Sequence, residues 1–387
     1  MKALVFDRSK TDWENSKGFE LVDIPKPVLD KSNPSDDSYV LLKVHYAGVC
    51  GTDRGIWNRV AFGEVITGTI DEQIKNGGNS YRVIGHEFFG EVVEVGGKVT
   101  EVKVGDFVAC ESHVVCEKCY QCLHGQKEVC TNEKILGISH DGGFAEFAKV
   151  PVHIVRKTDI AKIRPEIAVM QEPFGNAVHA GSKVDLKDKT VAIFGLGPIG
   201  LFLTLVVKGL GAKTVIGVEP NPTAAEMAKK LGIDHVIPLV HKPNQDKPYS
   251  HNQEVVDQIK ELTGGLGADV SFEMSGFNSS VNNCLYATRR GGDIVLFGIK
   301  QGDFIFEDFN RLIFNGFTLH AVIGRQLWRT WDITKKLFED QTNGIQEKLF
   351  NVILNGGNDT ILPISEYSKE KFETMMASHP KFLLKFN

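Results

Sequence analysis

The sequence predicts an α/β protein with two domains, a partly open β-barrel followed by a doubly wound parallel sheet. The chain has 387 residues, which favours two domains because one domain commonly spans roughly 100–200 residues. Its first part, up to about residue 165, is rich in short β-forming runs. From about residue 175 onward, apolar strands alternate with helices, and this alternation is typical of a parallel sheet.

The barrel prediction rests on runs of β-branched and aromatic residues in the first part of the chain. Gly, Pro and Asp separate these runs, as the turns between short strands require. The runs that we predict as strands cover residues 1–6, 40–44, 90–95, 106–109 and 144–150.

The parallel sheet is predicted from a regular order of strand and helix in the second part. The expected strands cover residues 190–194, 214–218, 235–237, 269–273 and 292–297, and the expected helices cover residues 199–209, 223–231, 255–263 and 279–287. We expect the first domain to span residues 1–175 and the second to span 176–333. Residues 334–387 are mixed and polar, and we expect them to return to the first domain.

The overall composition excludes several classes of function. Hydrophobic residues make up 42% and charged residues 24% of the chain, and the formal net charge is −5. This balance gives no reason to expect nucleic acid or a membrane surface as a partner. The uncharged run 191–207 contains three glycines and a proline, so it fits a buried strand, turn and helix better than a membrane span. No signal peptide is visible, and a cytoplasmic location is expected.

The cysteines give the strongest single motif. Seven occur, and four of them follow the pattern Cys116-x2-Cys119-x2-Cys122-x7-Cys130. An odd number with this clustering favours metal binding in a reducing compartment over disulfides. Four thiolates fill a zinc tetrahedron and leave no open position, so this spacing predicts a structural zinc. An iron–sulfur cluster is the rival interpretation, although ferredoxin spacing differs and is usually followed by Pro.

A second set of donors predicts a catalytic metal. Cys50, His86 and Glu87 offer a thiolate, an imidazole and a carboxylate. Three protein ligands with an exchangeable fourth position define a catalytic zinc site. Taken alone, these residues are weak evidence, because a single Cys or His is more often structural.

Two longer motifs carry a family resemblance. The run Gly85-His86-Glu87-x2-Gly90-x5-Gly96-x2-Val99 resembles the signature of the zinc-containing alcohol dehydrogenases, within the medium-chain dehydrogenases. The run Gln171-Glu172-Pro173-Phe174-Gly175-Asn176-Ala177-Val178 is similar to the L-threonine 3-dehydrogenase and sugar dehydrogenase branches. The resemblance implies a GroES-like catalytic domain and two zinc ions per chain, with Glu172 as a fourth or exchangeable ligand. The alternative is that Glu172 only caps the helix that follows it.

A glycine-rich turn follows the first strand of the parallel sheet. Its residues are Gly195, Gly197, Pro198, Ile199 and Gly200. Between a strand and a helix, this pattern predicts a dinucleotide site, with the pyrophosphate at the helix N-terminus.

The next strand ends at Glu219, whose carboxylate would accept hydrogen bonds from the adenosine ribose. It would also repel a 2′-phosphate, and no Arg follows closely, so NAD is favoured over NADP. By resemblance, Phe297, Gly298, Ile299 and Ala321 line the nicotinamide half of the site.

The resemblance also implies a mechanism, from which the sequence departs at two points. Zinc would lower the pKa of the alcohol, and the hydride would pass to NAD. Thr52 corresponds to the hydroxyl that starts the family's proton relay. Threonine dehydrogenases place a His at the position of Gly55, and Gly cannot carry a proton. Cys50 and His86 are 36 positions apart, a longer span than in relatives, and the surplus around residues 61–81 is expected to border the substrate cleft.

Three hypotheses about function follow. The first is an NAD-dependent secondary alcohol dehydrogenase resembling L-threonine 3-dehydrogenase, in which Arg54 or Arg325 could pair with a substrate carboxylate. The second keeps the chemistry and takes a polyol or aldose. The third is a cofactor-binding regulator without turnover, which the three intact zinc donors disfavour. By analogy with relatives, we expect a homo-oligomer formed through a sheet edge near residues 304–314.

Overall fold

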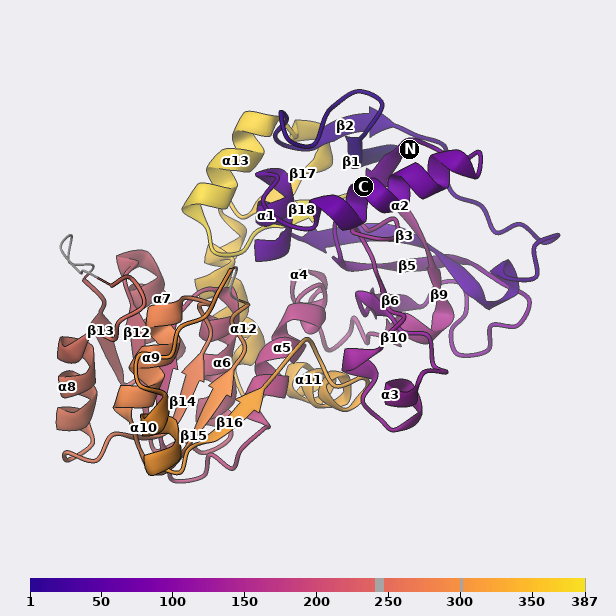
Figure 1. Ribbon diagram of the computed structural model, residues 1–387. Coiled ribbons are helices and arrows are strands. Elements are labelled where there is room, and N and C mark those ends of the chain that lie inside the picture. The colour runs from indigo at the N-terminus through magenta and orange to yellow at the C-terminus, as the bar shows by residue number, and fades with distance from the viewer. Residues whose placement is uncertain (241–246, 300–301, 387) are drawn as a thin grey trace. The chain divides into compact units, whose positions relative to one another are not determined.

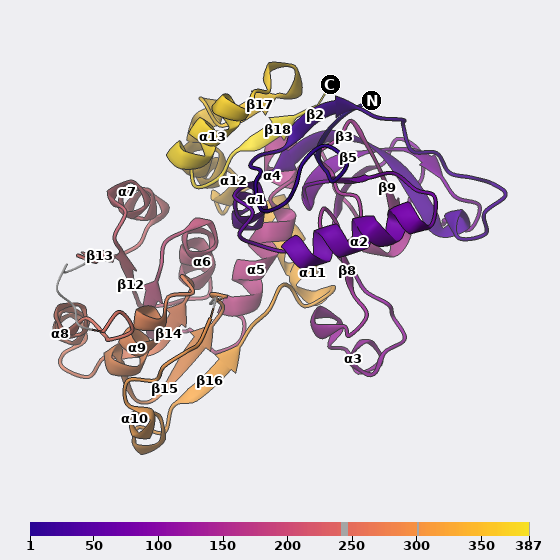
Figure 2. The same cartoon turned by 45° about the horizontal axis from the view of Figure 1, so that its top comes forward.

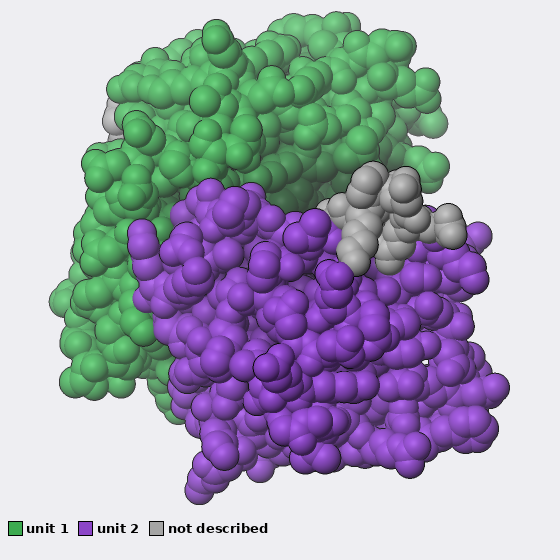
Figure 3. All heavy atoms as spheres, turned by 90° about the vertical axis from the view of Figure 1, so that its left-hand side faces the viewer, with its two compact units in different colours: residues 1–172, 335–387 green, residues 173–334 purple. Residues whose placement is uncertain are grey.

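The computed structural model describes residues 1–240, 247–299 and 302–386. The chain divides into two compact units, and each is described by itself. Unit 1 comprises Met1–Glu172 and Lys335–Asn387, and unit 2 comprises Pro173–Thr334. Figure 3 shows the two units in different colours. The divisions fall in the first turn of α5 (Gln171–Gly181) and within α11 (Arg329–Glu339).

Unit 1 is built on two β-sheets. The larger sheet has the strand order β10-β6-β5-β3-β18-β17, with β9 also pairing with β3, and the smaller one has the order β2-β1-β4 (Figure 1). The strands of both sheets and of a short hairpin are β1 (Lys2–Asp7), β2 (Glu20–Asp23), β3 (Tyr39–Gly48), β4 (Tyr81–Val83), β5 (Glu87–Val95), β6 (Phe107–Cys110), β7 (His113–Val114), β8 (Lys134–Ile135), β9 (Phe147–Pro151), β10 (Val155–Lys157), β17 (Ile361–Pro363) and β18 (Leu383–Lys385). Antiparallel pairing of β3 with β5 and β9 confirms the β-rich first domain.

The α-helices of unit 1 range in length from four to 13 residues. They are α1 (Gly51–Trp57), α2 (Gly63–Lys75), α3 (Tyr120–Leu123), α4 (Pro165–Ala168), α12 (Ile345–Lys348) and α13 (Lys369–Ser378). The C-terminal strand β18 pairs with β3, with Leu383 opposite Gly48 and Lys385 opposite Tyr46. The last residues of the chain therefore belong to the sheet of unit 1, and they adjoin the strand that leads to Cys50.

Unit 2 is a six-stranded parallel sheet with helices. The strand order is β13-β12-β11-β14-β15-β16 (Figure 1), and all neighbours are parallel. Its strands are β11 (Thr190–Phe194), β12 (Thr214–Glu219), β13 (His235–Pro238), β14 (Ala268–Glu273), β15 (Thr288–Leu296) and β16 (Thr318–Ala321), and its other helices are α6 (Pro198–Gly209), α7 (Pro222–Leu231), α8 (Gln253–Leu262), α9 (Asn278–Ala287) and α10 (Phe309–Phe314). This is the predicted doubly wound sheet.

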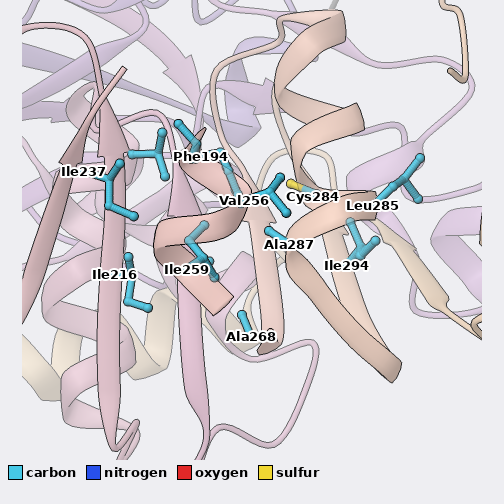
Figure 4. Packing of buried hydrophobic residues seen from close by; sticks show 13 residues of the cluster. Phe194, Ile216, Ile237, Val256, Ile259, Ala268, Cys284, Leu285, Ala287 and Ile294 are labelled. Carbon is cyan, nitrogen blue, oxygen red and sulfur yellow. The ribbon is translucent and has the colours of Figure 1, made fainter. Parts of the chain in front are cut away.

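One hydrophobic core of unit 2 lies between the sheet and the helices α8 and α9 (Figure 4). Side chains of α8 such as Val256 and Ile259 meet strand residues such as Ile216 and Ile294, and all four are fully buried. Cys284 packs in the same cluster and is fully buried, as predicted for a core cysteine. The strongly apolar helix α6 has only 12 residues. None of the helices in the described residues is both long and apolar enough to cross a membrane.

Candidate functional site

The three predicted donors of the catalytic metal converge in unit 1. Cys50 precedes α1, and His86 and Glu87 lie where β5 begins, beside β3. Donor atoms of the three residues lie within 4.8 Å of one another. His86 is 7% exposed and Glu87 is fully buried. The Oε1 atom of Glu87 is buried without a hydrogen-bond partner. This donor set and this unpaired oxygen fit a zinc ion held by three protein ligands.

Asp53 orients two of these donors, and the sequence reasoning had not assigned it a role. Its carboxylate accepts a hydrogen bond from the backbone N–H of Cys50 at 2.8 Å. Its other oxygen lies 3.4 Å from Nδ1 of His86. Burial lowers the pKa of His86, but the charges of Asp53 and Cys50 outweigh it and hold that pKa well above its ordinary value. A carboxylate behind the imidazole fixes the ring orientation, as is common at metal sites.

A buried lysine also contacts the donor cluster. The ammonium of Lys381 lies against Glu87 Oε2 and donates to the carbonyl of Val49 at 3.2 Å. Lys381 is 1% exposed. A side chain at Gly48 would collide with this ion pair, since its Cβ would lie 2.3 Å from Glu87 Oε2. Lys381 stands in a largely apolar C-terminal run, and a charge at such a position was the signal that could have revealed it.

Two residues that follow Cys50, Arg54 and Gly55, do not make the contacts expected of a substrate carboxylate site and of a proton relay. Thr52 lies in the first turn of α1 and is partly buried. At Gly55, an added Cβ would lie 2.8 Å from the Cβ of Ala61. Ala61 therefore leaves no space for a side chain at the position of the relay histidine. Arg54 donates to the carbonyls of His379 at 2.5 Å and Pro380 at 3.1 Å. The Arg54 guanidinium therefore ties α1 to the C-terminal segment.

Glu172 lies in the first turn of α5 and is 4% exposed. Among the described residues, the donor group within 4.8 Å consists of Cys50, His86 and Glu87 and does not include Glu172. Its role as a fourth or exchangeable ligand remains a prediction.

The surplus segment around residues 61–81 forms α2, which Figure 2 labels, and the turn before β4. Its contacts are with the N-terminal part of unit 1. Thr69 of α2 accepts a hydrogen bond from Arg82 at 3.3 Å, and Asp71 accepts one from Arg8 at 2.5 Å. The segment also borders a surface hollow of about 420 Å³. These contacts attach α2 to the small N-terminal sheet, and its place beside a substrate cleft remains a prediction.

The four clustered cysteines also meet. Donor atoms of Cys116, Cys119, Cys122 and Cys130 lie within 4.8 Å of one another. The backbone N–H of Cys116 donates to Cys130 Sγ, and that of Cys119 donates to Cys116 Sγ, each at 3.3 Å. Hydrogen bonds from Cys122 and from Thr131 together lower the pKa of the Cys119 thiol to about 5, against the opposing effect of burial. Four sulfurs with N–H donors around them fit a closed, structural zinc site.

The glycine-rich turn has the geometry expected of a dinucleotide site. Gly195 follows β11 with φ +95°, a conformation that glycine adopts without strain. Gly197 precedes α6, and a Cβ there would meet nothing within 4 Å. A Cβ on Gly200 would lie 2.1 Å from the carbonyl oxygen of Gly195. Pro198 and Ile199 open α6, where the free N–H groups can face phosphate.

Glu219 ends β12 beside this turn and is 9% exposed. One carboxylate oxygen accepts the N–H of Leu196 at 2.7 Å, and the other accepts the N–H of Asn221 at 2.8 Å. The carboxylate thus holds the turn, and its contact with a ribose remains a prediction. Each carboxylate oxygen can accept more than one hydrogen bond, so these contacts leave acceptor capacity for ribose.

The residues expected near the nicotinamide follow two neighbouring strands. Phe297, Gly298 and Ile299 come directly after β15, and Ile299 is 76% exposed. Ala321 ends β16, where it pairs with Leu296. All four lie at the carboxyl ends of parallel strands, the edge at which open α/β sheets bind ligands.

The chain is similar to known proteins over most of its length. Residues 36–160 match the family described as alcohol dehydrogenase GroES-like domain, and residues 198–339 match zinc-binding dehydrogenase. The L-threonine 3-dehydrogenase of Pyrococcus horikoshii is 38% identical over 326 residues, covering 83% of this chain and 84% of that protein. That of Caldanaerobacter subterraneus subsp. tengcongensis is 36% identical over 353 residues, covering 90% and 91%.

The chain belongs to the zinc-containing alcohol dehydrogenases. It is an oxidoreductase that acts on CH–OH groups. Solved structures agree on the fold of this dehydrogenase. The alcohol dehydrogenase TADH from Thermus sp. ATN1 has a TM-score of 0.80 at 22% identity and covers 100% of both chains. The 2R,3R-butanediol dehydrogenase from Bacillus subtilis has a TM-score of 0.78 at 24% identity, covering 100% of this chain and 99% of that one.

Proposed function

We propose that this dehydrogenase oxidises the secondary hydroxyl group of L-threonine with NAD as the hydride acceptor. The convergence of Cys50, His86 and Glu87 in one buried cluster is the observation that carries the catalytic part of the proposal. The substrate rests on relatives named L-threonine 3-dehydrogenase, which are 35–39% identical over most of their length.

The residues of the cluster have separate roles in the proposal. When bound, zinc would supply Lewis acidity to the alcohol oxygen and NAD would supply the hydride acceptor. Cys50, His86 and Glu87 would hold the metal, with Glu172 as an exchangeable fourth ligand. The Thr52 hydroxyl would accept the proton of the alcohol and at the same time pass its own proton towards the ribose of the cofactor. Since Gly55 carries no side chain, the proton would then pass to water and not to the relay histidine of threonine dehydrogenases.

Two further proposals concern cofactors and location. The second donor cluster, on four cysteines, supports two zinc ions per chain. The carboxylate of Glu219 at the end of β12 supports NAD over NADP, because it would repel a 2′-phosphate. A cytoplasmic location is supported by seven cysteines that are all free of disulfide bonds, as is usual in a reducing compartment.

A polyol or aldose is the second candidate substrate, and one observation favours it. Both arginines that could pair with a threonine carboxylate have other partners. Arg54 donates to backbone carbonyls, and the 2% exposed Arg325 donates to Asn176 Oδ1 at 2.9 Å. A sugar would be recognised by neutral or acidic hydrogen-bonding groups and needs no arginine.

Initial rates over a substrate panel separate the two candidates. The zinc-loaded enzyme is assayed with NAD and with NADP on L-threonine, D-threonine, sorbitol, xylitol and glucose. We expect kcat/KM for L-threonine with NAD to exceed every other combination by at least about tenfold, equivalent to about 1.4 kcal/mol of transition-state stabilisation. A maximum on a polyol or aldose selects the second candidate.

Inactivity on every member of the panel would contradict both candidates and favour a cofactor-binding regulator. The Cys50→Ser variant supplies the control for that outcome. In an enzyme it loses one zinc and all turnover, whereas in a regulator the zinc content is unchanged by the substitution.

A further inference from the structure

A buried glutamate at the end of β14 connects three loops at the ligand-binding edge of unit 2. Glu273 is the last residue of β14 and is 1% exposed. The strand order places β11 and β14 side by side in the sheet, with β12 beyond β11 and β15 beyond β14. Successive strands are added on one side of β11 up to β13 and on its other side from β14 onward, so the strand order reverses between β11 and β14. In open α/β sheets, ligands bind at the carboxyl ends of the strands at such a point.

The side chain of Glu273 holds the loop that follows β14. One carboxylate oxygen accepts the N–H of Ser275 at 2.9 Å, the hydroxyl of Ser275 at 2.5 Å and the N–H of Gly276 at 3.0 Å. The other oxygen accepts the N–H of Gly276 at 3.2 Å. A desolvated carboxylate needs such donors, and hydrogen bonds to a charged acceptor are stronger than neutral ones. The loop is therefore fixed by one side chain.

Glu273 also fixes the loop after β15, through hydrogen bonds to its backbone carbonyl and through close packing against its side chain. Its carbonyl oxygen accepts the N–H groups of Phe297 at 3.0 Å and Gly298 at 3.1 Å. A Cβ on Gly298 would lie 2.5 Å from Glu273 Oε2 and 2.1 Å from the nitrogen of Gly276. Only a glycine fits between the two loops, which places the loop after β15 directly against the carboxylate.

The glycine-rich turn is the third loop in this arrangement. A Cβ on Gly195 would lie 2.8 Å from the Cβ of Ser275, so the turn packs against the serine that Glu273 holds. On its other side, Glu219 binds the N–H of Leu196. The turn thus lies between two glutamates, each the last residue of a neighbouring strand. Glu219 is 9% exposed, whereas Glu273 is 1% exposed and lies behind the loops.

From this geometry we propose that Glu273 is a positioning residue for the nicotinamide cofactor. It acts through Ser275, Gly276 and Gly298 by fixing the loops that face the cofactor, and it does not touch the cofactor itself. The inference rests on the proposed function, because it assumes that the glycine-rich turn binds NAD. Its consequence is that loss of the carboxylate weakens cofactor binding more than it weakens the chemical step.

The test compares Glu273→Gln with Asp269→Asn in the full-length, zinc-loaded protein. Asp269 lies near the opposite end of the same strand and, like Glu273, accepts a backbone N–H, that of Thr190 at 2.8 Å. Dissociation constants for NADH and NAD are measured by fluorescence and calorimetry, together with kcat at saturating NAD and the melting temperature. Glu273→Gln is expected to raise the NADH dissociation constant about tenfold and to change kcat less than about twofold. Asp269→Asn is expected to lower the melting temperature and leave the dissociation constant within about twofold of wild type.

A second variant keeps the test decisive if Glu273→Gln fails to fold. Ser275→Ala leaves the carboxylate in place and removes only the hydroxyl donor, and it is expected to raise the NADH dissociation constant about threefold. Equal effects of Glu273→Gln and Asp269→Asn on the dissociation constant, or wild-type binding by Ser275→Ala, overturn the inference. A wild-type protein that binds neither NADH nor NAD overturns the proposed function together with it.

Discussion

The imidazole of His179 is buried with only one of its nitrogens paired. Its Nδ1 lies 3.0 Å from the carbonyl oxygen of Gly324, while Nε2 is buried without a hydrogen-bond partner. Burial lowers the pKa of His179 from 6.5 to about 4. Above pH 6.5 neither the folded nor the unfolded chain binds this proton. Between pH 6.5 and 4 only the unfolded chain binds it, so the free energy of unfolding falls as the pH falls.

We therefore predict that acid destabilises the wild type more than a variant without this imidazole. Between pH 8 and pH 5, the His179 contribution to the free energy of unfolding falls by about 2 kcal/mol. Urea unfolding of wild type and His179→Gln at both pH values measures it. The variant should be less stable at pH 8 and lose less stability on acidification. Parallel losses in the two proteins would show that His179 is protonated in the folded state.

Lys381 and Glu87 form a buried ion pair, and the energetic role of this pair would change if Glu87 binds the proposed zinc. Without the metal, Lys381 is the partner of the Glu87 carboxylate, and removing one member of a buried pair typically costs about 3–5 kcal/mol. With the metal, the carboxylate would have a second cation. We predict that Lys381→Met lowers the melting temperature of chelator-treated protein much more than that of zinc-loaded protein. The difference between the two melting temperatures should increase by roughly 5 °C or more.

Lys385→Met is the matched control for this prediction. Lys385 lies close to Lys381 in the chain, on strand β18, but is exposed. Its substitution should therefore leave the difference between the two melting temperatures as it is in wild type. Differential scanning calorimetry with and without chelator gives both melting temperatures. The same difference in melting temperature in wild type, Lys381→Met and Lys385→Met would mean that Lys381 and the metal do not compete for Glu87.

At the residue scale, the sequence predicted the donors but not what surrounds them. Cys50, His86 and Glu87 belong to motifs with recognisable spacing, so they could be found from the chain alone. Lys381 lies 294 positions after Glu87, and only the pairing of β18 with β3 brings it there. The charge of Lys381 in an apolar run marks it as unusual, but no local pattern names Glu87 as its partner.

At the scale of elements, the lobe around α3 depends on its four cysteines. It contains little other structure, since α3 has four residues and the hairpin of β7 and β8 is paired through His113 and Val114 alone. Tyr120 and Leu123 of α3 are 68% and 70% exposed, so burial contributes little to its stability. Such small elements usually need a metal to stay folded.

We predict that Cys122→Ser removes one zinc per chain and unfolds this lobe locally. The expected signs are cleavage by trypsin near Lys118 and Lys127, which wild type resists, and a zinc content that falls by one by atomic absorption. The Cys110→Ser variant is the control, because Cys110 is a buried core residue outside the cluster. It should keep both its zinc content and its resistance. An unchanged zinc content in Cys122→Ser would contradict the structural zinc.

Elements of unit 2 could be predicted closely, and elements of unit 1 less so. The strand at 190–194 and the helix starting near Pro198 follow from an apolar run and a glycine turn, which are local signals. The run 144–150 predicted a strand, but β9 begins only at Phe147, because the backbone of Phe144 instead forms long-range hydrogen bonds with Ile84 and Leu4. The helix α2 was not predicted, since only Ile66 and Ile70 of its residues are buried.

At the scale of the whole molecule, unit 2 has an apolar sheet edge. Strand β16 is the last in its sheet and pairs with β15 alone among the described strands. Nearby in the chain, Phe309, Ile313 and Phe314 of α10 are 55%, 60% and 78% exposed. An unpaired edge strand and exposed apolar side chains favour association with another chain. We propose that this edge joins two copies into a homo-oligomer.

Sedimentation velocity tests this association. Wild type is expected to sediment as a dimer or tetramer, and Phe314→Glu should shift it toward the monomer at micromolar concentration. Leu266→Glu provides the control, because Leu266 is 71% exposed in unit 2 but precedes β14 rather than β16. A monomeric wild type, or the same shift in both variants, would exclude this edge as the interface.

Unit 1 is formed by two separate segments of the chain, and this determines the order in which its parts are synthesised and can fold. The ribosome completes residues 173–334, all of unit 2, before it makes the segment Lys335–Asn387 that unit 1 still lacks. Until then, β3 is paired at Tyr46–Gly48 with β5 on one edge only, and the edge that β18 will occupy is open. The predicted zinc donors are thus synthesised before unit 2, whereas the lysine beside Glu87 is synthesised after it. The sheet of unit 1 cannot be completed before β18 has been made, and until then this edge of β3 is open to pairing with other strands.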